Sequence, residues 1–353
     1  MKLKNFMKRI LILKTLHTRY RKFKVKNKIK VLITGGAGFV GAHLTYKLIS
    51  LGHKVLVVDI LKSQGGIPFV NKNCNFIKGD ISKLSTIKKI KKWRPNVIYH
   101  LAAQSAVEPA YDDPKFDIMT NTYGTFLLCS LAKELRVKKF IYTSSAAAIG
   151  NNSKKIINEK IKVNPDSLYG ITKYNGEILI KQILGPTKTQ TTIFRLFNTY
   201  GPGEDLNNLK KGMVSIYSSY VWKKKPIIVK GSLNRFRDFV YIKDCVNILS
   251  KCIEKTFKKK DELFHLTMGE NLTVRELIKK IIKASNNSAN YPVKIAKNTP
   301  GDSFGFRSSN NKLKKQFNYI KKYNVDRGLK EYFKWIRKVP VRKNIKSHHP
   351  LKN

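Results

Sequence analysis

The chain has 353 residues, 42% of them hydrophobic, which is enough for one large or two modest domains around a substantial core. It has no apolar run of membrane-spanning length, and its four scattered cysteines indicate neither a disulfide framework nor a zinc site, so we expect a cytoplasmic protein without a transmembrane segment or a bound metal. The net charge is +49, but lysines occur in every segment, which favours a general drift in composition over a specific nucleic-acid site; binding to nucleic acid or to an anionic membrane surface stays an alternative.

Residues 1–27 contain many basic residues around a small apolar patch, and they contain no acidic residue. We interpret them as a basic extension ahead of a fold that begins near Lys28, while an organellar presequence or a membrane-surface helix stays open. Residues 341–353 are also basic and rich in turn-forming residues, and we expect this tail to be unstructured.

A strand, a glycine-rich turn and a helix are predicted in that order. Residues 31–33 form a short apolar run, and apolar residues recur at helical spacing from Phe39 onward. Between them, residues 35–41 contain the G-x-G-x-x-G pattern of dinucleotide-binding turns. Glycine permits the tight backbone of such a turn, and a pyrophosphate can lie on the free N–H groups of the helix N-terminus. The residues predicted to bind the cofactor here are Gly35, Gly38, Phe39, Val40 and Gly41.

A second strand is predicted at residues 54–58, and it ends in Asp59, about twenty residues beyond the glycine turn. At this place a carboxylate would accept hydrogen bonds from the ribose hydroxyls of adenosine and would disfavour a 2′-phosphate. We therefore predict NAD, and not NADP, as the cofactor.

Three further strands are predicted at residues 74–81, 95–101 and 140–145, with helical patterns between them. Apolar strands that alternate with helices indicate an α/β fold with a Rossmann-type, doubly wound parallel sheet. Ligands bind such sheets beyond the carboxyl ends of the strands. The residues predicted at the cofactor from these strand ends are Asp80, Ile81, Leu101, Ala102 and Ala103.

Tyr169 and Lys173 are four residues apart in a predicted helix and therefore lie on one of its faces. A lysine ammonium beside a phenol lowers the pKa of the phenol, and it can also hydrogen-bond a ribose hydroxyl. The Ser-rich end of the strand upstream, at Ser144 and Ser145, offers hydroxyls that could orient a substrate. We predict Tyr169 and Lys173 as a catalytic pair on this basis.

The order of these motifs resembles the extended short-chain dehydrogenase/reductase family. Within it the chain is most similar to the NAD-dependent nucleotide-sugar epimerases and dehydratases, and among these to the UDP-glucose and UDP-N-acetylglucosamine 4-epimerases. The resemblance covers residues 28–338. Besides the glycine turn and the Tyr-x-x-x-Lys pair, it rests on Gly-Asp at 79–80, His-Leu-Ala-Ala at 100–103, Tyr-Thr-Ser-Ser-Ala at 142–146, Arg-Leu-Phe-Asn-Thr-Tyr-Gly-Pro-Gly at 195–203 and Arg-Asp-Phe-Val-Tyr-Ile at 237–242.

The resemblance also implies roles for individual residues. Tyr169 would be the general acid and base, Lys173 its partner on the nicotinamide ribose, and Ser145 a donor to the reacting sugar oxygen. Asn198 and Arg237 would hold the diphosphate of a nucleotide-sugar substrate, and the forked donors of an arginine suit that task. The residues expected at the substrate are Ser144, Ser145, Asn198, Arg237, Asp302 and Phe306.

The resemblance further implies a domain organisation and an assembly. The NAD-binding Rossmann domain would comprise residues 28–200 and about 238–266. A smaller C-terminal α/β domain, at about 201–237 and 267–340, would bind the nucleotide sugar in a cleft between the two. A homodimer would form through helices within residues 121–135 and 169–184.

The residues after Ser145 select among the reactions of the family. Dehydrating relatives place an Asp-Glu pair there, decarboxylating relatives a Glu and some C5 epimerases a Cys, whereas this chain has Ala146 and Ala147. Oxidation and re-reduction at one carbon needs only Tyr, Lys, Ser and NAD, so we predict a 4-epimerase of a UDP-hexose. The alternatives are a 4-keto-sugar reductase, which would use the same three residues, and a basic nucleic-acid or membrane-surface binding protein on the same fold.

Overall fold

The computed structural model describes residues 28–62, 66–151, 156–297, 304–341 and 350–351. The predicted extension at residues 1–27, Asp302 and most of the predicted tail at 341–353 lie outside them. A seven-stranded parallel sheet forms the centre of the molecule, in the order β11-β7-β5-β4-β1-β2-β3. Its strands are β1 (Lys30–Thr34), β2 (Lys54–Asp59), β3 (Asn75–Lys78), β4 (Val97–His100), β5 (Lys139–Ser145), β7 (Gln190–Leu196) and β11 (Asp261–Leu266).

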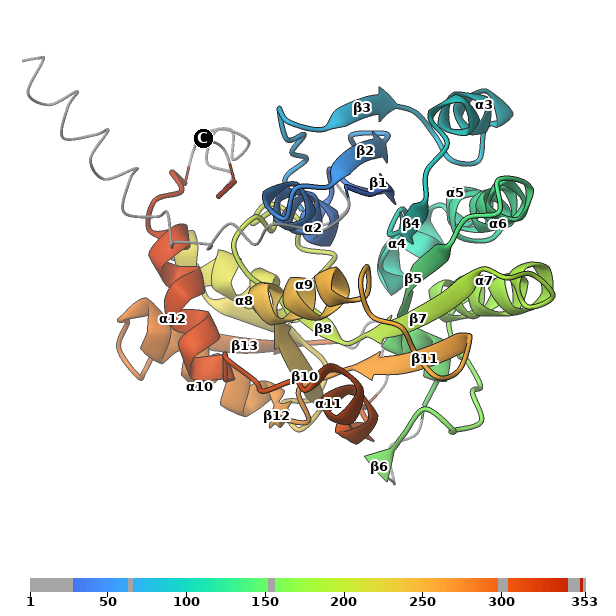
Figure 1. Ribbon diagram of the computed structural model, residues 1–353. Helices are drawn as coiled ribbons and strands as arrows, with labels where there is room; N and C mark the ends of the chain where they lie inside the picture. Colours follow the sequence, from blue (N-terminus) through green and yellow to red (C-terminus); the bar gives the residue numbers. More distant parts are fainter. Residues whose placement is uncertain (1–27, 63–65, 152–155, 298–303, 342–349, 352–353) are drawn as a thin grey trace, which may run out of the picture.

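Helices cover both faces of this sheet, as the apolar runs require. Val31 and Ile33 of β1 are fully buried in one apolar cluster, while Leu32 between them is fully buried in the other, because successive side chains of a strand point to opposite faces. In Figure 1, α2 (Phe39–Ser50) and α9 (Ile242–Lys251) lie on one side, and α3 (Leu84–Trp93), α6 (Gly124–Glu134) and α7 (Leu168–Leu184) on the other. The predicted α/β fold with a Rossmann-type, doubly wound parallel sheet is confirmed.

A smaller group of elements extends the core on the side of α2 and α9 (Figure 1). A three-stranded sheet has the order β12-β10-β8, and two pairs of short strands, β9 with β13 and β6 with β14, accompany it. The elements of this group are β6 (Ile156–Ile157), β8 (Asn198–Tyr200), α8 (Met213–Trp222), β9 (Ile227–Lys230), β10 (Phe236–Tyr241), β12 (Asn271–Thr273), α10 (Val274–Ser285), β13 (Val293–Ala296), β14 (Arg307–Ser308), α11 (Asn311–Phe317) and α12 (Val325–Ile336).

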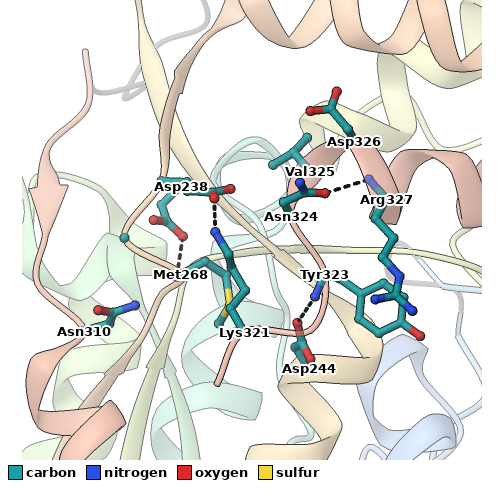
Figure 2. Close-up of polar contacts among 12 residues, drawn as sticks. Asp238, Asp244, Met268, Asn310, Lys321, Tyr323, Asn324, Val325, Asp326 and Arg327 are labelled. Atoms are coloured by element: carbon teal, nitrogen blue, oxygen red, sulfur yellow. Dashed lines mark hydrogen bonds and ion pairs between the residues drawn. The ribbon is translucent and has the colours of Figure 1, made fainter. Parts of the chain in front are cut away.

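Side-chain caps fix where α12 begins. Asn324 accepts a hydrogen bond from the N–H of Arg327 at 2.9 Å, as an N-cap residue does. Asp244 of α9 accepts from the N–H of Tyr323 at 3.0 Å. This bond connects the loop before α12 to α9, a helix that covers the central sheet. Figure 2 shows both contacts.

The short elements between β4 and α7 differ from a simple strand–helix alternation. They are α4 (Val107–Asp112), α5 (Pro114–Asp117), the π-helix η1 (Ile118–Tyr123) and the 3₁₀-helix η2 (Ala146–Ile149). The strand predicted at 74–81 is also shorter, because the carboxylate of Asp80 accepts from the N–H and hydroxyl of Ser82 and forms a turn after β3. The predicted domain limits stay predictions. Within the described ranges, no helix has both the length and the apolar character needed to cross a membrane.

Candidate active site

A cavity of about 540 Å³ opens at the carboxyl ends of β1, β4 and β5, where the strand order reverses between β1 and β4. This is the place at which doubly wound sheets bind ligands. All predicted site residues that the structure describes line this cavity; Asp302 lies outside the described residues. The predicted residues that line it are Gly35, Gly38, Phe39, Val40, Gly41, Asp59, Asp80, Ile81, Leu101, Ala102, Ala103, Ser144, Ser145, Tyr169, Lys173, Asn198, Arg237 and Phe306.

The glycine turn between β1 and α2 fits a phosphate group. Gly35 has φ +69°, and a Cβ there would lie 2.6 Å from the backbone nitrogen of Ala102. A Cβ on Gly41 would lie 2.1 Å from the carbonyl oxygen of Gly35, so the helix can approach the turn this closely only with glycine. Gly38 caps α2 in an extended conformation without a side-chain cap, which leaves N–H groups of the first helical turn available to an anion.

Asp59 ties the end of β2 to this turn. Its carboxylate accepts from the N–H of Ala37 at 3.0 Å and from the N–H of Leu61 at 2.7 Å. Burial raises the pKa of Asp59, and these backbone donors act in the opposite direction. The carboxylate thus supports the turn and also faces the cavity, where it could accept from a ribose.

A buried histidine fixes the ends of β1 and β4. The Thr125 hydroxyl donates to the carbonyl of Asn121 at 2.6 Å, so it accepts from Nε2 of His100, and Nδ1 is left to accept from the hydroxyl of Thr34 at 2.8 Å. Burial, with the charge of Lys173, holds the pKa of His100 well below its usual value and keeps the ring neutral. This chain of bonds holds the two strand ends that carry the cofactor residues.

The predicted catalytic pair lies at the start of α7. Ser167 caps this helix by accepting from the N–H of Gly170 at 3.2 Å, and a Cβ on Gly170 would lie 2.4 Å from the carbonyl oxygen of Ala147. The helix therefore begins directly beside η2, which follows Ser145. This packing brings Tyr169 and Ser145 to the same wall of the cavity.

Burial dominates the titration of this pair. It raises the pKa of Tyr169 to about 12, although a hydrogen bond with Ser145 lowers it, and it lowers the pKa of Lys173 to about 7. The Lys173 ammonium lies 4.3 Å from the centre of the Tyr142 ring, and the carboxylate of Asp117 raises its pKa. Desolvation of the phenol is the largest influence on the pKa of Tyr169, and a lowering of this pKa by Lys173 stays a prediction.

A buried polar cluster behind Lys173 escaped the sequence analysis. The hydroxyl of Thr172 donates to Asp117, and the amide of Asn121 donates to Asp117 and to the carbonyl of Gln104, at 3.1 Å each. Asn121 lies in the π-helix η1, a form that often occurs at functional sites. The cluster places a carboxylate next to the ammonium that the site needs.

The hydroxyl of Ser144 has a partner within the protein. Its hydroxyl donates to Glu177 at 2.6 Å, and Glu177 forms a buried, two-point ion pair with Arg195, at 2.9 Å and 2.7 Å. Both charged side chains are at most 6% exposed. Ser144 lines the cavity, but in this structure its hydroxyl helps to satisfy the ion pair that joins α7 to β7.

Asn198 and Arg237 lie on the opposite wall, which β8 and β10 form. Asn198 donates to the carbonyl of Asp238 at 3.1 Å, and Arg237 donates to the carbonyls of Phe236 at 2.8 Å and Phe304 at 3.1 Å. Burial and the neighbouring charge of Arg235 lower the pKa of Arg237 to about 10. These contacts hold a cation in a fixed orientation at the cavity, as the binding of a diphosphate requires.

Two further neighbours complete this wall. Asp238 accepts from the N–H of Met268 at 2.8 Å (Figure 2), and burial raises its pKa to about 7. The charge of Lys321, which pairs with Glu270, acts in the opposite direction. Phe306 packs edge-on against Phe197, with ring centres 5.8 Å apart. Phe306 thus presents a firmly packed ring to the cavity.

Glu204 and Lys211 are among the charged residues of the cavity that were not predicted. Glu204 is 3% exposed and accepts from the N–H of Gly201 at 2.9 Å, and burial raises its pKa to about 8. Lys211 donates to the hydroxyl of Ser105 at 2.6 Å. Glu204 directly follows the Gly-Pro-Gly motif, and this position could have identified it as a candidate site residue. Nothing in the sequence distinguishes Lys211 from the many other lysines.

Known proteins resemble the chain over most of its length. Residues 31–266 match the family described as NAD dependent epimerase/dehydratase family. A putative UDP-glucose 4-epimerase of Methanocaldococcus jannaschii is 31% identical over 248 residues, which cover 70% of this chain and 79% of the relative.

Two solved structures have the same fold. The UDP-glucose 4-epimerase of Thermotoga maritima with UDP-glucose superposes with a TM-score of 0.82 at 29% identity, covering 88% of this chain and 99% of the other. The UDP-glucose 4-epimerase of Thermus thermophilus in complex with NAD gives a TM-score of 0.80 at 25% identity, with the same coverage of 88% and 99%.

These comparisons confirm the resemblance inferred from the motifs, and they confirm NAD, on which this family depends, as the cofactor. The chain belongs to the NAD-dependent epimerase/dehydratase family, as an NAD-dependent sugar epimerase or a related enzyme.

Proposed function

We propose that the protein is an NAD-dependent 4-epimerase of a nucleotide sugar, with a UDP-hexose as the expected substrate. The observation that carries the proposal is the gathering of Tyr169, Lys173 and Ser145 on one wall of a cavity that also contains the glycine turn. Ala146 and Ala147 line the same wall and supply no acid or base for an elimination. Tyr169, Lys173 and Ser145 thus offer proton transfer at one sugar oxygen, and residues 146 and 147 add no acid or base for an elimination.

The residues of the cavity fit NAD. The turn at Gly35, Gly38 and Gly41 would hold the pyrophosphate against the N-terminus of α2, because side chains there would fill the cradle. Asp59 would accept from the adenosine ribose, and Lys173 would donate to the nicotinamide ribose. When bound, NAD would take hydride from C4 of the sugar and return it to the opposite face.

Tyr169 would move the proton that accompanies this exchange. As phenolate it would accept the proton of the C4 hydroxyl, and as phenol it would return that proton to the oxygen of the 4-keto sugar. Burial disfavours the phenolate of Tyr169, whereas its hydrogen bond with Ser145 favours it. A protonated Lys173 would favour the phenolate as well, so we expect the activity of Tyr169 to depend on both. Arg237 and Asn198 would keep the diphosphate in place while the keto sugar turns over.

We also propose that the protein forms a homodimer through α6 and α7. These helices pack side by side, and large apolar side chains on them are exposed, among them Phe126 at 42% and Ile178 at 42%. Tyr123 of η1 stacks on Phe126 and extends this surface. An apolar patch on paired helices is typical of a contact with a second copy.

A substitution of the phenol tests the proposal. Tyr169→Phe should lower the rate of sugar epimerisation by about 100-fold or more, because positioned proton transfer contributes on the order of 10²–10⁴. Tyr174→Phe removes a hydroxyl from the same helix at a residue that does not line the cavity, and it should leave the rate unchanged. Near-native turnover by Tyr169→Phe would contradict the assigned role. Retained cofactor in the variant would show that the loss lies in proton transfer.

A further inference from the structure

Lys211 is a cation in the cavity wall that the proposed reaction does not use. It lies one residue before Gly212, which has φ +82° and caps α8. Its ammonium donates to the hydroxyl of Ser105, in the loop after β4, at 2.6 Å. A lysine ammonium has three donors, so this contact leaves two for a ligand.

The charge of Lys211 is weakly compensated by the protein. Among the residues that the structure describes, no carboxylate lies within ion-pair distance of it. Glu204 is the acid that raises its pKa, while burial raises the pKa of Glu204 itself to about 8. Burial accordingly lowers the pKa of Lys211 to about 8. A partly buried cation of this kind gains most from an anion that arrives with the ligand.

Lys211 lies at the strand end that leads to the predicted catalytic residues. It bonds to Ser105, which follows β4, and β4 pairs with β5, the strand that ends in Ser145. Lys211, Ser145 and Tyr169 all line the cavity, and the charge of Lys211 lowers the pKa of Lys173. Other cations also line the cavity: Lys62, Lys210, Lys230, Arg235 and Arg237. We associate Arg237 with the diphosphate and Lys211, because of its contact after β4, with the sugar.

We propose that Lys211 recognises a carboxylate on the sugar, so that the preferred substrate is a nucleotide-linked hexuronic acid. The inference rests on the proposed 4-epimerase function and names its substrate class. C6 of a hexose is joined to C4 through C5 alone, so a carboxylate at C6 lies close to the reacting carbon. A neutral C6 hydroxyl could accept one hydrogen bond from Lys211, but it would leave the charge of the ammonium without a partner.

The test measures binding rather than turnover. Dissociation constants of UDP-glucuronic acid and UDP-glucose are determined by calorimetry for the NAD-loaded protein and for Lys211→Met, Lys211→Arg and Lys210→Met. The unchanged protein should bind UDP-glucuronic acid on the order of tenfold to a hundredfold more tightly, as a charge-assisted hydrogen bond implies. Lys211→Met should abolish this preference and Lys211→Arg should keep it.

Lys210→Met is the matched control. It removes the same charge from the adjacent residue, but Lys210 is half-exposed and pairs with Asp112 at 2.6 Å, so the preference should persist. Equal affinity for the two ligands, no binding of either, or a preference that survives Lys211→Met would overturn the inference. Equal affinity together with epimerisation of neutral UDP-hexoses would overturn it and leave the proposed function intact. Binding of the uronate through Lys211 without any epimerisation would support the inference and contradict the function.

Discussion

Removal of the charge of Glu177 should destabilise the protein and disturb the catalytic lysine. Glu177 accepts two hydrogen bonds from Arg195 and one from Ser144, and the two charged side chains are 6% and 4% exposed. In Glu177→Gln the new amide group would face the guanidinium, and the buried charge of Arg195 would lose its counter-charge. Among the residues that the structure describes, Nη1 of Arg195 already has no hydrogen-bond partner.

The size of the effect follows from burial. Breaking a buried ion pair costs about 3–5 kcal/mol, because the remaining charge is left in a medium of low dielectric constant. For a chain of this length that corresponds to a fall in melting temperature on the order of 5–10 °C. Glu177 also raises the pKa of Lys173, so the variant should lower that pKa further and move the alkaline limb of the activity profile, where Lys173 loses its proton, to lower pH.

Thermal unfolding followed by circular dichroism measures the first effect. Glu331→Gln is the control, because it breaks an exposed pair with Lys334 and should change the melting temperature little. The double variant Glu177→Met with Arg195→Met should recover much of the stability, since no buried charge is left unpaired. A melting temperature of Glu177→Gln within about one degree of the unchanged protein would refute this reasoning.

Three further changes test other parts of the account. Gly41→Ala places a Cβ against the Gly35 carbonyl, and the purified, folded variant should carry far less bound NAD than the unchanged protein when extracts are assayed by chromatography. Glu204 has an ordinary pKa of 4.5 when unfolded and about 8 when folded, so the folded state binds more protons between these values and the free energy of unfolding should fall as pH rises from about 5 to 8. Urea titrations at several pH values should show that the free energy of unfolding falls less steeply with pH in Glu204→Gln. Phe126→Asp should convert dimers to monomers in light scattering, whereas Leu84→Asp, at an exposed leucine of α3, should not; dimers that persist in Phe126→Asp would contradict the proposed interface.

Local patterns were enough to predict the centre of the fold and much of the site. The glycine turn, the strand that ends in Asp59 and the Tyr169–Lys173 spacing each lie within a short stretch whose chemistry depends on neighbours in the chain. The parallel sheet then brings the strand ends together at one edge, which explains why every described candidate residue lines one cavity.

Contacts between distant segments could not be predicted in this way. The hydrogen bonds of Asp117 with Thr172 and of Lys211 with Ser105 join residues that are 55 and 106 positions apart, so neither has a local signal in the sequence. The pKa of Tyr169 depends on its burial, which motif spacing does not report. The ion pair of Glu177 and Arg195 had a partial signal, since apolar residues directly adjoin each charge, and charges in such places are usually paired.

The most direct test of the proposed reaction uses the purified protein without added cofactor. UDP-glucose, UDP-galactose, their N-acetyl forms and the two corresponding uronic acids are incubated separately, and the products are resolved by chromatography. The account predicts that one 4-epimeric pair, the uronic acids first of all, interconverts to the same equilibrium mixture from either side while the bound NAD is retained. No interconversion of any pair, together with reduction of a nucleotide-linked 4-keto sugar that consumes one added reduced cofactor per product, would contradict it and identify a reductase.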